Sequence, residues 1–458
     1  MLNPFKRLFN RDAVELELNH IQGYVLGDRP TPYYGTHALL RYDSAVTGRK
    51  LLARVRPLLP SAQDWQGHQQ HENADEAWMA LAITFEGLKA LELPEATLNS
   101  FPEAFRAGMA ARARQLHDVG ENDPKNWEKP YGHQQIHVAL TIIASSEEKW
   151  KAKRDEATQA LKELPGVQLL GQHDFAMPSD VTNVFGFRDG ISNPDVEGSG
   201  TVPLPGYGHP IKPGEFLLGY PGESGVVFPT PQPEVLGKNG TYLVFRKYHS
   251  RVAEFNKYIH DHAPDEASRE LLAAKFFGRW RSGAPLTLAP THDDPALGRD
   301  PHRNNDFNYE GDELGKVVPL GCHMRRMNPR DTKQSVISDV NLHRIIRRSV
   351  SYGPPLPPDQ TTDDGQERGL YYLAVSAKAP ETVEFLQQQW INDGNFVNLG
   401  DENDPIVGLN AGEGTFTVPQ DPIRRRYPNL ETFNVLRGGE YFFLPGLPAI
   451  DWLSQAPA

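Results

Sequence analysis

Apolar residues recur along the chain in two spacings, one typical of strands and one of helices. Four segments of the first half carry the strand pattern: 36–42, 77–84, 135–144 and 167–175. The alternation is clearest in the third segment, where Val138, Leu140 and Ile142 fall on one face. This half of the chain is therefore expected to supply a sheet with one strongly apolar face.

Helical patterns lie between these strands. Helices are expected over 85–93 and 102–120, and a capping-box pattern of Ser145 with Glu148 opens a third helix that ends at Pro165-Gly166. Strands and helices that alternate in this order, with short connections, are typical of a βαββαβ, ferredoxin-like unit.

The second half repeats this order. Strands are expected over 241–248, 369–377 and 439–446, and helices over 250–259 and 380–390. The pattern therefore predicts an α+β protein built from two units of one design.

Two Pro/Gly-rich segments, 195–240 and 352–369, interrupt the second half. Long loops in a compact protein are either surface connections or the walls of a functional site. Both border segments that are rich in charged residues, which favours a shared pocket.

Composition narrows the class of protein. Of the 458 residues, 38% are hydrophobic and 23% are charged, and the formal net charge is -12. This balance argues against nucleic acid or an anionic membrane as a partner. The lone Cys322 excludes an internal disulfide and covalent haem attachment through Cys-x-x-Cys-His. Neither a signal peptide nor an apolar run of spanning length is seen, so a cytoplasmic location is expected.

Candidate chemistry gathers in three segments: "VFGFRDGISNP" (184–194), "GCHMRRMNPRD" (321–331) and "HRIIRRSVSYGPP" (343–355). Asp189, between two glycines, is either a turn former or a carboxylate held over another group. His323 is either a structural residue or a metal ligand. Buried arginines need anionic partners, so the basic segments indicate an anion near the core, such as a cofactor that bears carboxylates or phosphates.

Together with other blocks in a fixed order, these segments resemble the dye-decolourising peroxidases, haem enzymes built from two ferredoxin-like halves. The blocks are "GFRDGISNP" (186–194), which matches the family's Gly-x-x-Asp-Gly signature, "PGEFLLGY" (213–220), "GRWRSGAPLTLAP" (278–290), "NDFNYEGDELG" (305–315), "CHMRRMNPRD" (322–331) and "HRIIRRSVSYGPP" (343–355). The resemblance covers about residues 20 to 450, and the chain length resembles the larger, C/D-like subclass.

The resemblance implies a fold and a domain division. Duplicated ferredoxin-like units would form a dimeric α+β barrel-like arrangement, with haem in the C-terminal half. An N-terminal extension is expected at 1–20, an N-terminal ferredoxin-like domain at 21–178, and a haem-binding domain with long loops at 179–458.

The resemblance also implies roles for individual residues. His323 would be the axial ligand of haem iron, with Asp189 as distal proton shuttle and Arg347 stabilising charge beside it. Arg330 would lie near a haem propionate. Asp404, in "DPIVG", would accept a hydrogen bond from the proximal imidazole, although Glu384 competes for that role. Cys322 remains an alternative axial ligand, as a thiolate.

The implied function is a haem b peroxidase that reduces hydrogen peroxide through a ferryl intermediate. Its electron donors would be dyes, phenols, other small aromatic compounds or metal ions. Partners among nucleic acids and membranes are not expected, and a homo-oligomer is allowed. Two alternatives remain: a haem-handling protein that releases iron, similar to a deferrochelatase, and a cofactor-free binding module in which the Gly-Asp loop is only a turn.

Overall fold

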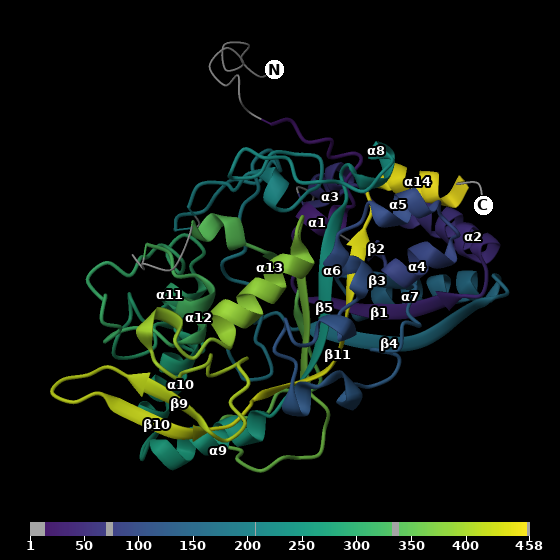
Figure 1. The fold of residues 1–458 in the computed structure, drawn as a ribbon. Helices are drawn as coiled ribbons and strands as arrows, with labels where there is room; N and C mark the ends of the chain where they lie inside the picture. The colour runs from purple at the N-terminus through teal and green to yellow at the C-terminus, as the bar shows by residue number, and fades with distance from the viewer. Residues whose placement is uncertain (1–13, 70–76, 207, 332–338, 456–458) are drawn as a thin grey trace, which may run out of the picture.

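The protein is described here by a computed structural model covering residues 14–69, 77–206, 208–331 and 339–455 (Figure 1). Residues 1–13 of the expected N-terminal extension lie outside these ranges. Its centre is one antiparallel sheet in the order β4-β1-β3-β2-β11-β5-β8-β6, with β7 paired to β8, and a separate hairpin of β9 and β10. The strands are β1 (Tyr33–Tyr42), β2 (Ala77–Ile83), β3 (Val138–Ala144), β4 (Val167–Met177), β5 (Thr241–Ser250), β6 (Ile346–Arg347), β7 (Val350–Tyr352), β8 (Gly369–Ser376), β9 (Gly414–Val418), β10 (Arg425–Leu430) and β11 (Asn434–Leu444).

Helices cover the sheet and build a second, loop-rich region beside it (Figure 1). They are α1 (Gly23–Leu26), α2 (Ala45–Val55), α3 (Ala62–Gln69), α4 (Phe85–Ala90), α5 (Glu95–Asn99), α6 (Glu103–Ala107), α7 (Glu147–Lys162), α8 (Glu234–Gly237), α9 (Val252–His262), α10 (Glu266–Phe277), α11 (Pro295–Arg299), α12 (His323–Met327), α13 (Ala379–Phe385) and α14 (Leu447–Gln455). Among the described residues, none of these helices combines the length and the apolar character needed to cross a bilayer.

The sheet curls on itself. The edge strand β4 contacts β7, which belongs to the opposite end of the strand order. As a result β5 is buried along almost its whole length on both faces. The curled sheet encloses aromatic and histidine side chains from β1, β4, β5 and β8.

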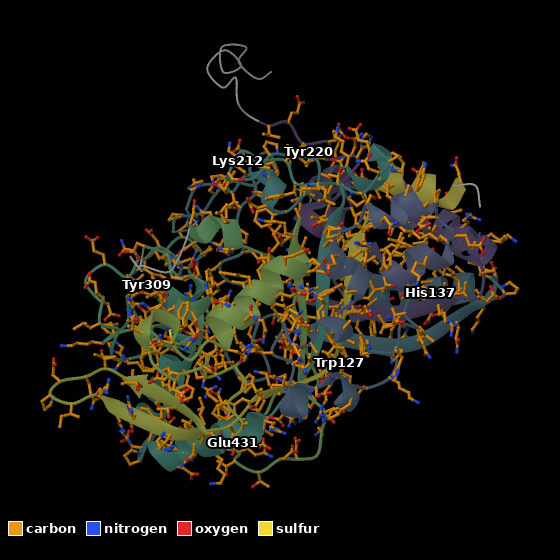
Figure 2. All side chains as sticks on the ribbon, viewed as in Figure 1. Trp127, His137, Lys212, Tyr220, Tyr309 and Glu431 are labelled. Carbon is orange, nitrogen blue, oxygen red and sulfur yellow. The ribbon has the colours of Figure 1, made fainter. Side chains whose placement is uncertain are left out.

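Two apolar clusters hold the molecule together. The larger joins the sheet to the helices on its faces, and the smaller lies under α9 and α10, in the loop-rich region. Phe255 and Phe276 are fully buried in the smaller cluster, and each such side chain contributes about 1.5–3 kcal/mol. Figure 2 shows Tyr309 in this loop-rich region and His137 beside the strands of the other half.

The structure confirms the predicted strands and the α+β class, and it corrects two local predictions. The expected helix over 102–120 is wrong, because α6 ends at Ala107 and Gly108 has a φ of +75°. A residue with positive φ cannot continue a right-handed helix. The capping residue of α7 is Ser146 rather than Ser145, since its side chain accepts the N–H of Lys149.

Candidate active site

Asp189 lies in a loop that is shaped by its own backbone. Asn183 Oδ1 accepts the N–H groups two and four residues later in the chain, at 3.0 and 3.1 Å. Gly186 and Gly190 have φ values of +79° and +81°, which glycine adopts without steric cost. The two glycines of the sequence pattern therefore serve a tight turn that presents the Asp189 carboxylate.

Arg347 stands on the short strand β6 and faces this carboxylate. Its Nη2 donates to Asp189 Oδ1 at 3.2 Å, and the same oxygen accepts the N–H of Gly190 at 2.7 Å. Asn193 fixes the backbone of Arg347, since its Oδ1 accepts the Arg347 N–H at 2.9 Å and its Nδ2 donates to the Arg347 carbonyl at 3.3 Å. The loop and the strand thus position the pair together.

The charge around Asp189 favours its ionised form. Burial raises the pKa of this carboxyl, but Arg347, the N–H of Gly190 and Arg29 together outweigh burial, so its pKa lies below the ordinary value. The Asp189 side chain is 17% exposed and that of Arg347 is 36% exposed. An ionised, accessible carboxylate of this kind can accept a proton from a small bound molecule.

His323 is the first residue of α12 and contacts a second carboxylate. Its Nδ1 lies 2.8 Å from Asp404 Oδ2. The other Asp404 oxygen accepts the N–H groups of Ile406 and Val407 at 2.8 and 3.0 Å. This pairing leaves His323 Nε2 directed away from Asp404, on a side chain that is 30% exposed.

Asp404 itself is fully buried. Burial raises the pKa of its carboxyl, but the His323 ring, the N–H of Val407 and Arg326 outweigh burial, so the pKa lies below its ordinary value. A carboxylate that accepts Nδ1–H fixes the tautomer and orientation of the imidazole, and it makes Nε2 a better metal ligand.

The structure places Glu384, the competing candidate, elsewhere. This carboxylate accepts two hydrogen bonds from Arg112, at 2.8 and 2.5 Å, and a third from the Tyr441 hydroxyl at 3.0 Å. Only Asp404 of the two candidates contacts the His323 ring, and no sequence spacing could have distinguished them.

Arg330 follows α12 and turns its guanidinium back into the loop-rich region. Nη1 donates to the carbonyls of Gly206 and Phe307 at 3.2 and 2.6 Å, and Nη2 donates to Asn305 Oδ1 at 2.5 Å. The guanidinium also lies 3.7 Å from the centre of the Phe307 ring. These contacts hold Arg330 in one orientation.

Arg344 is a residue of the site to which the sequence pattern assigned no individual role, although it belongs to the basic run of the quoted segment 343–355. Its Nη2 donates to the Ser192 carbonyl at 3.3 Å, and no carboxylate of the described residues forms an ion pair with it. Burial and the charge of Arg330 lower the pKa of Arg344 to about 10, while the Asp195 carboxylate acts in the opposite direction. The signal that could have identified Arg344 is its position three residues before Arg347, just ahead of β6.

Hydrogen bonds connect the loop of Asp189 to the segment after His323. Ser192 Oγ donates to Asn305 Oδ1 at 2.6 Å, and that oxygen also accepts Nη2 of Arg330. The Asp189–Arg347 pair and the His323–Asp404 pair therefore belong to one connected region.

These residues fit an iron porphyrin that carries carboxylate groups. His323, whose Nε2 is not bonded to Asp404, is a suitable axial donor, and Arg344 is a half-buried cation that forms no ion pair among the described residues. Arg330, which lowers the pKa of Arg344 and therefore lies near it, adds a second cation. Two cations close together favour an anionic group between or beside them.

Cys322 fits the thiolate alternative poorly. The side chain is fully buried in the smaller apolar cluster, and burial raises the pKa of its thiol to about 12. A thiol with that pKa stays protonated near neutral pH and is a weak metal ligand.

Comparison with known proteins gives matches along most of the chain. A family model described as the DyP dimeric alpha+beta barrel domain matches residues 49–167, and one described as Dyp-type peroxidase, C-terminal, matches 224–406. The chain is 34% identical to Peroxidase 2 of Mycetinis scorodonius, over 96% of this chain and 88% of the relative.

Solved structures of dye-decolourising peroxidases are similar to this chain over most of its length. An ancestral D-type dye-decolorizing peroxidase superposes with a TM-score of 0.84 at 30% identity, covering 96% of this chain and 99% of that one. A fungal DyP-type peroxidase from Auricularia auricula-judae gives 0.82 at 27% identity, covering 96% and 100%. A deferrochelatase of Yersinia pestis is 25% identical over only 45% of this chain and 36% of its own length. The chain therefore belongs to the family of dye-decolourising peroxidases, which are oxidoreductases.

Proposed function

We propose that this chain is a haem b-dependent peroxidase that reduces hydrogen peroxide and oxidises dyes, phenols or other one-electron donors. The observation that carries the proposal is the presence, in one connected region, of an imidazole oriented by Asp404 and an ionised Asp189 beside Arg347. When bound, haem would supply the redox-active iron, and the residues of the chain would hold it and move the protons.

The first role is binding. His323 would offer Nε2 to the metal while Asp404 accepts its Nδ1–H and prevents the ring from turning. Arg330 and Arg344 would bind the carboxylate side chains of the porphyrin. Because the chain has one cysteine, attachment through Cys-x-x-Cys-His is excluded and the cofactor would be held non-covalently.

The second role is proton transfer. Cleaving peroxide to water requires that a proton leave one oxygen and reach the other. Asp189, kept ionised by its surroundings, would accept the proton from the first oxygen and return it to the leaving oxygen. Arg347 would stabilise the negative charge that develops on the leaving oxygen, because a guanidinium remains cationic at every working pH.

The proposal extends to the domain boundary, the cellular location, the oligomeric state and the electron donors. The N-terminal ferredoxin-like domain would end at residue 178 and the haem-binding domain would begin at 179. A cytoplasmic location, a homo-oligomer and the use of metal-ion donors also remain predictions.

A haem titration of protein produced without haem tests the binding role. We expect a Soret band to saturate at one haem per chain in the wild type and to be lost or strongly shifted in His323→Ala. His302→Ala, a substitution at an exposed histidine, should leave the band unchanged. A wild type that takes up no haem would contradict the proposal.

The deferrochelatase relative supports a second candidate, removal of iron from haem with the porphyrin left intact. The products separate the two functions. A peroxidase turns over a dye in proportion to added peroxide, whereas an iron-releasing protein accumulates fluorescent metal-free porphyrin. The limited coverage of the deferrochelatase match favours the peroxidase.

A further inference from the structure

Inside the curled sheet lies a pair of side chains that the proposed peroxidase site does not use. The hydroxyl of Tyr131 lies 2.8 Å from Nε2 of His173 on β4. Their rings are stacked at 5.8 Å with an interplanar angle of 15°. Tyr131 is buried, and the described residues give its hydroxyl no hydrogen-bond partner other than His173.

We propose that Tyr131 and His173 form a redox-active pair that stores one oxidising equivalent as a tyrosyl radical. The inference rests on the proposed peroxidase function, which supplies the oxidant. Tyr131 would give one electron to the peroxide-oxidised cofactor, its O–H bond would break, and the proton would pass to His173 Nε2. The products are a neutral phenoxyl radical and an imidazolium, and a one-electron donor would reverse both transfers.

The protonation states of the pair suit this step. Burial raises the pKa of Tyr131 well above its ordinary value, so the resting phenol keeps its proton. Burial, together with the charge of Lys247, lowers the pKa of His173 to about 4, so the resting imidazole is neutral and can accept a proton. A phenol that loses an electron becomes a strong acid, and a base within hydrogen-bond distance allows electron and proton to move together.

Aromatic rings lead from the pair to β8, the strand that pairs with β6. His173 lies 5.3 Å from Tyr371 on β8, and Tyr371 stacks on Tyr352 at 4.5 Å, measured between ring centroids. In the sheet register Arg347 is opposite Ala374, three residues along β8 from Tyr371. At about 3.3 Å per strand residue, this is roughly 10 Å along the strand. The packed rings therefore end on β8, and the three-residue offset places the Tyr371 side chain on the sheet face opposite Arg347, so the last step of the electron path has to cross β8.

The neighbouring tyrosines are less suited to hold the radical. The Tyr352 hydroxyl donates to the carbonyl of Tyr248 at 3.0 Å, and a carbonyl cannot take up the released proton. The Lys247 ammonium also lies 5.6 Å from the centre of the Tyr352 ring, which disfavours positive charge there. Tyr441 donates to Glu384, a carboxylate that is already held by two hydrogen bonds from Arg112. Among the described tyrosines, only Tyr131 has its hydroxyl hydrogen-bonded to a neutral ring base.

The packing keeps the Tyr131 ring in place. A Cβ atom at Gly438 on β11 would overlap this ring, so the missing side chain makes room for it. The ring is also stacked with Phe245 at 5.9 Å and 16°. A rigid site reduces the reorganisation that electron transfer would otherwise require.

Freeze-quench electron paramagnetic resonance of the haem-loaded protein after mixing with hydrogen peroxide tests the proposal. We expect a tyrosyl signal whose coupling to the hydrogen-bonded proton disappears in D₂O. This signal should be lost in Tyr131→Phe and strongly reduced in His173→Phe. Tyr242→Phe is the matched control, because it removes a buried hydroxyl that has no partner in the described structure, and it should keep the signal. An unchanged signal in Tyr131→Phe would overturn the proposal.

A second measurement separates this inference from the proposed function. Haem-free protein is oxidised by flash photolysis with a ruthenium tris(bipyridine) photo-oxidant and persulfate. A D₂O-sensitive tyrosyl radical that is absent in Tyr131→Phe supports the pair without any cofactor, whereas a lack of dye turnover by the haem-loaded protein would refute the peroxidase proposal alone. If the wild type forms no D₂O-sensitive tyrosyl radical in either experiment, the proposed pair is refuted.

Discussion

Asp404 and Asp189 are both carboxylates that face a nitrogen-containing side chain, but the protein holds them in different ways. Asp404 is fully buried and accepts two backbone N–H groups besides His323. Asp189 is partly exposed, accepts one backbone N–H, and its bond to Arg347 is longer, at 3.2 Å. The buried carboxylate is suited to fix a ring, whereas the open one is suited to exchange a proton with a bound molecule.

The largest effect is expected from removing the open carboxylate. Asp189→Ala should lower the second-order rate constant of the reaction with hydrogen peroxide by about 10²–10⁴-fold, since general acid–base catalysis is worth that much. Haem affinity should change little, because His323 and Asp404 remain. Stopped-flow absorption measures the rate, and Asp359→Ala, at an exposed carboxylate, is the control. A rate within two-fold of the wild type (roughly 0.4 kcal/mol) would show that Asp189 has no part in proton transfer.

The second-largest effect is expected from Arg347→Leu. Loss of one electrostatic stabiliser typically costs about 10²–10³-fold, so the same rate constant should fall by that factor. The Soret titration should again stay close to that of the wild type. If haem binding is lost instead, Arg347 belongs with the residues that hold the cofactor, and the contrast between the two carboxylates would need revision.

Asp404→Asn tests the buried member of the comparison. The amide keeps the shape but loses the charge, so we expect haem affinity to fall by about 10–100-fold. Resonance Raman spectroscopy should also show a weaker bond between iron and His323. Glu384→Gln is the matched control, because this second buried carboxylate contacts Arg112 rather than His323. Equal effects of the two substitutions would contradict the proximal role of Asp404.

The pH dependence sharpens the same contrast. Because the pKa of Asp189 lies below its ordinary value of 3.8, its base form should persist as pH falls, and the peroxide rate should decline only below about that pH. In Arg347→Leu burial still raises the pKa of Asp189 while the main opposing charge is gone, so the acid limb of the pH profile should move to higher pH. A limb that moves to lower pH would exclude Asp189 as the titrating group.

The smallest effect is expected from Asn193→Ala. This side chain holds only the backbone of Arg347, through bonds of 2.9 and 3.3 Å. The loss of such hydrogen bonds is worth about 1 kcal/mol, so a roughly five-fold lower peroxide rate is expected. Serine at this position should restore part of the rate, and an effect as large as that of Arg347→Leu would mean that Asn193 acts directly.

The sequence allowed most of the sheet to be predicted, because strands that are buried on one or both faces leave a strong apolar pattern. It failed over 102–120, where the helical spacing of apolar residues continues past Gly108 although the backbone turns there. The spacing could not show this turn, since Gly108 is one of many glycines and not all of them have a positive φ.

The site was less accessible to sequence reasoning than the fold. The glycines around Asp189 marked its loop, because a tight turn requires their backbone freedom. Contacts between distant segments left no such mark: the choice between Asp404 and Glu384 depends on which carboxylate meets the His323 ring in space. Arg344 received no individual role from the sequence for the same reason, since its link to the Asp189 loop is a contact with the Ser192 carbonyl.

The position of β11 has a consequence for biosynthesis. This strand pairs with β5 along its length and also meets β2 through Phe443 and Ile83, so it joins strands from both halves of the chain. The ribosome makes it after His323, Arg347 and Asp404. A nascent chain therefore cannot close its sheet until β11 has been synthesised, later than every residue of the candidate site.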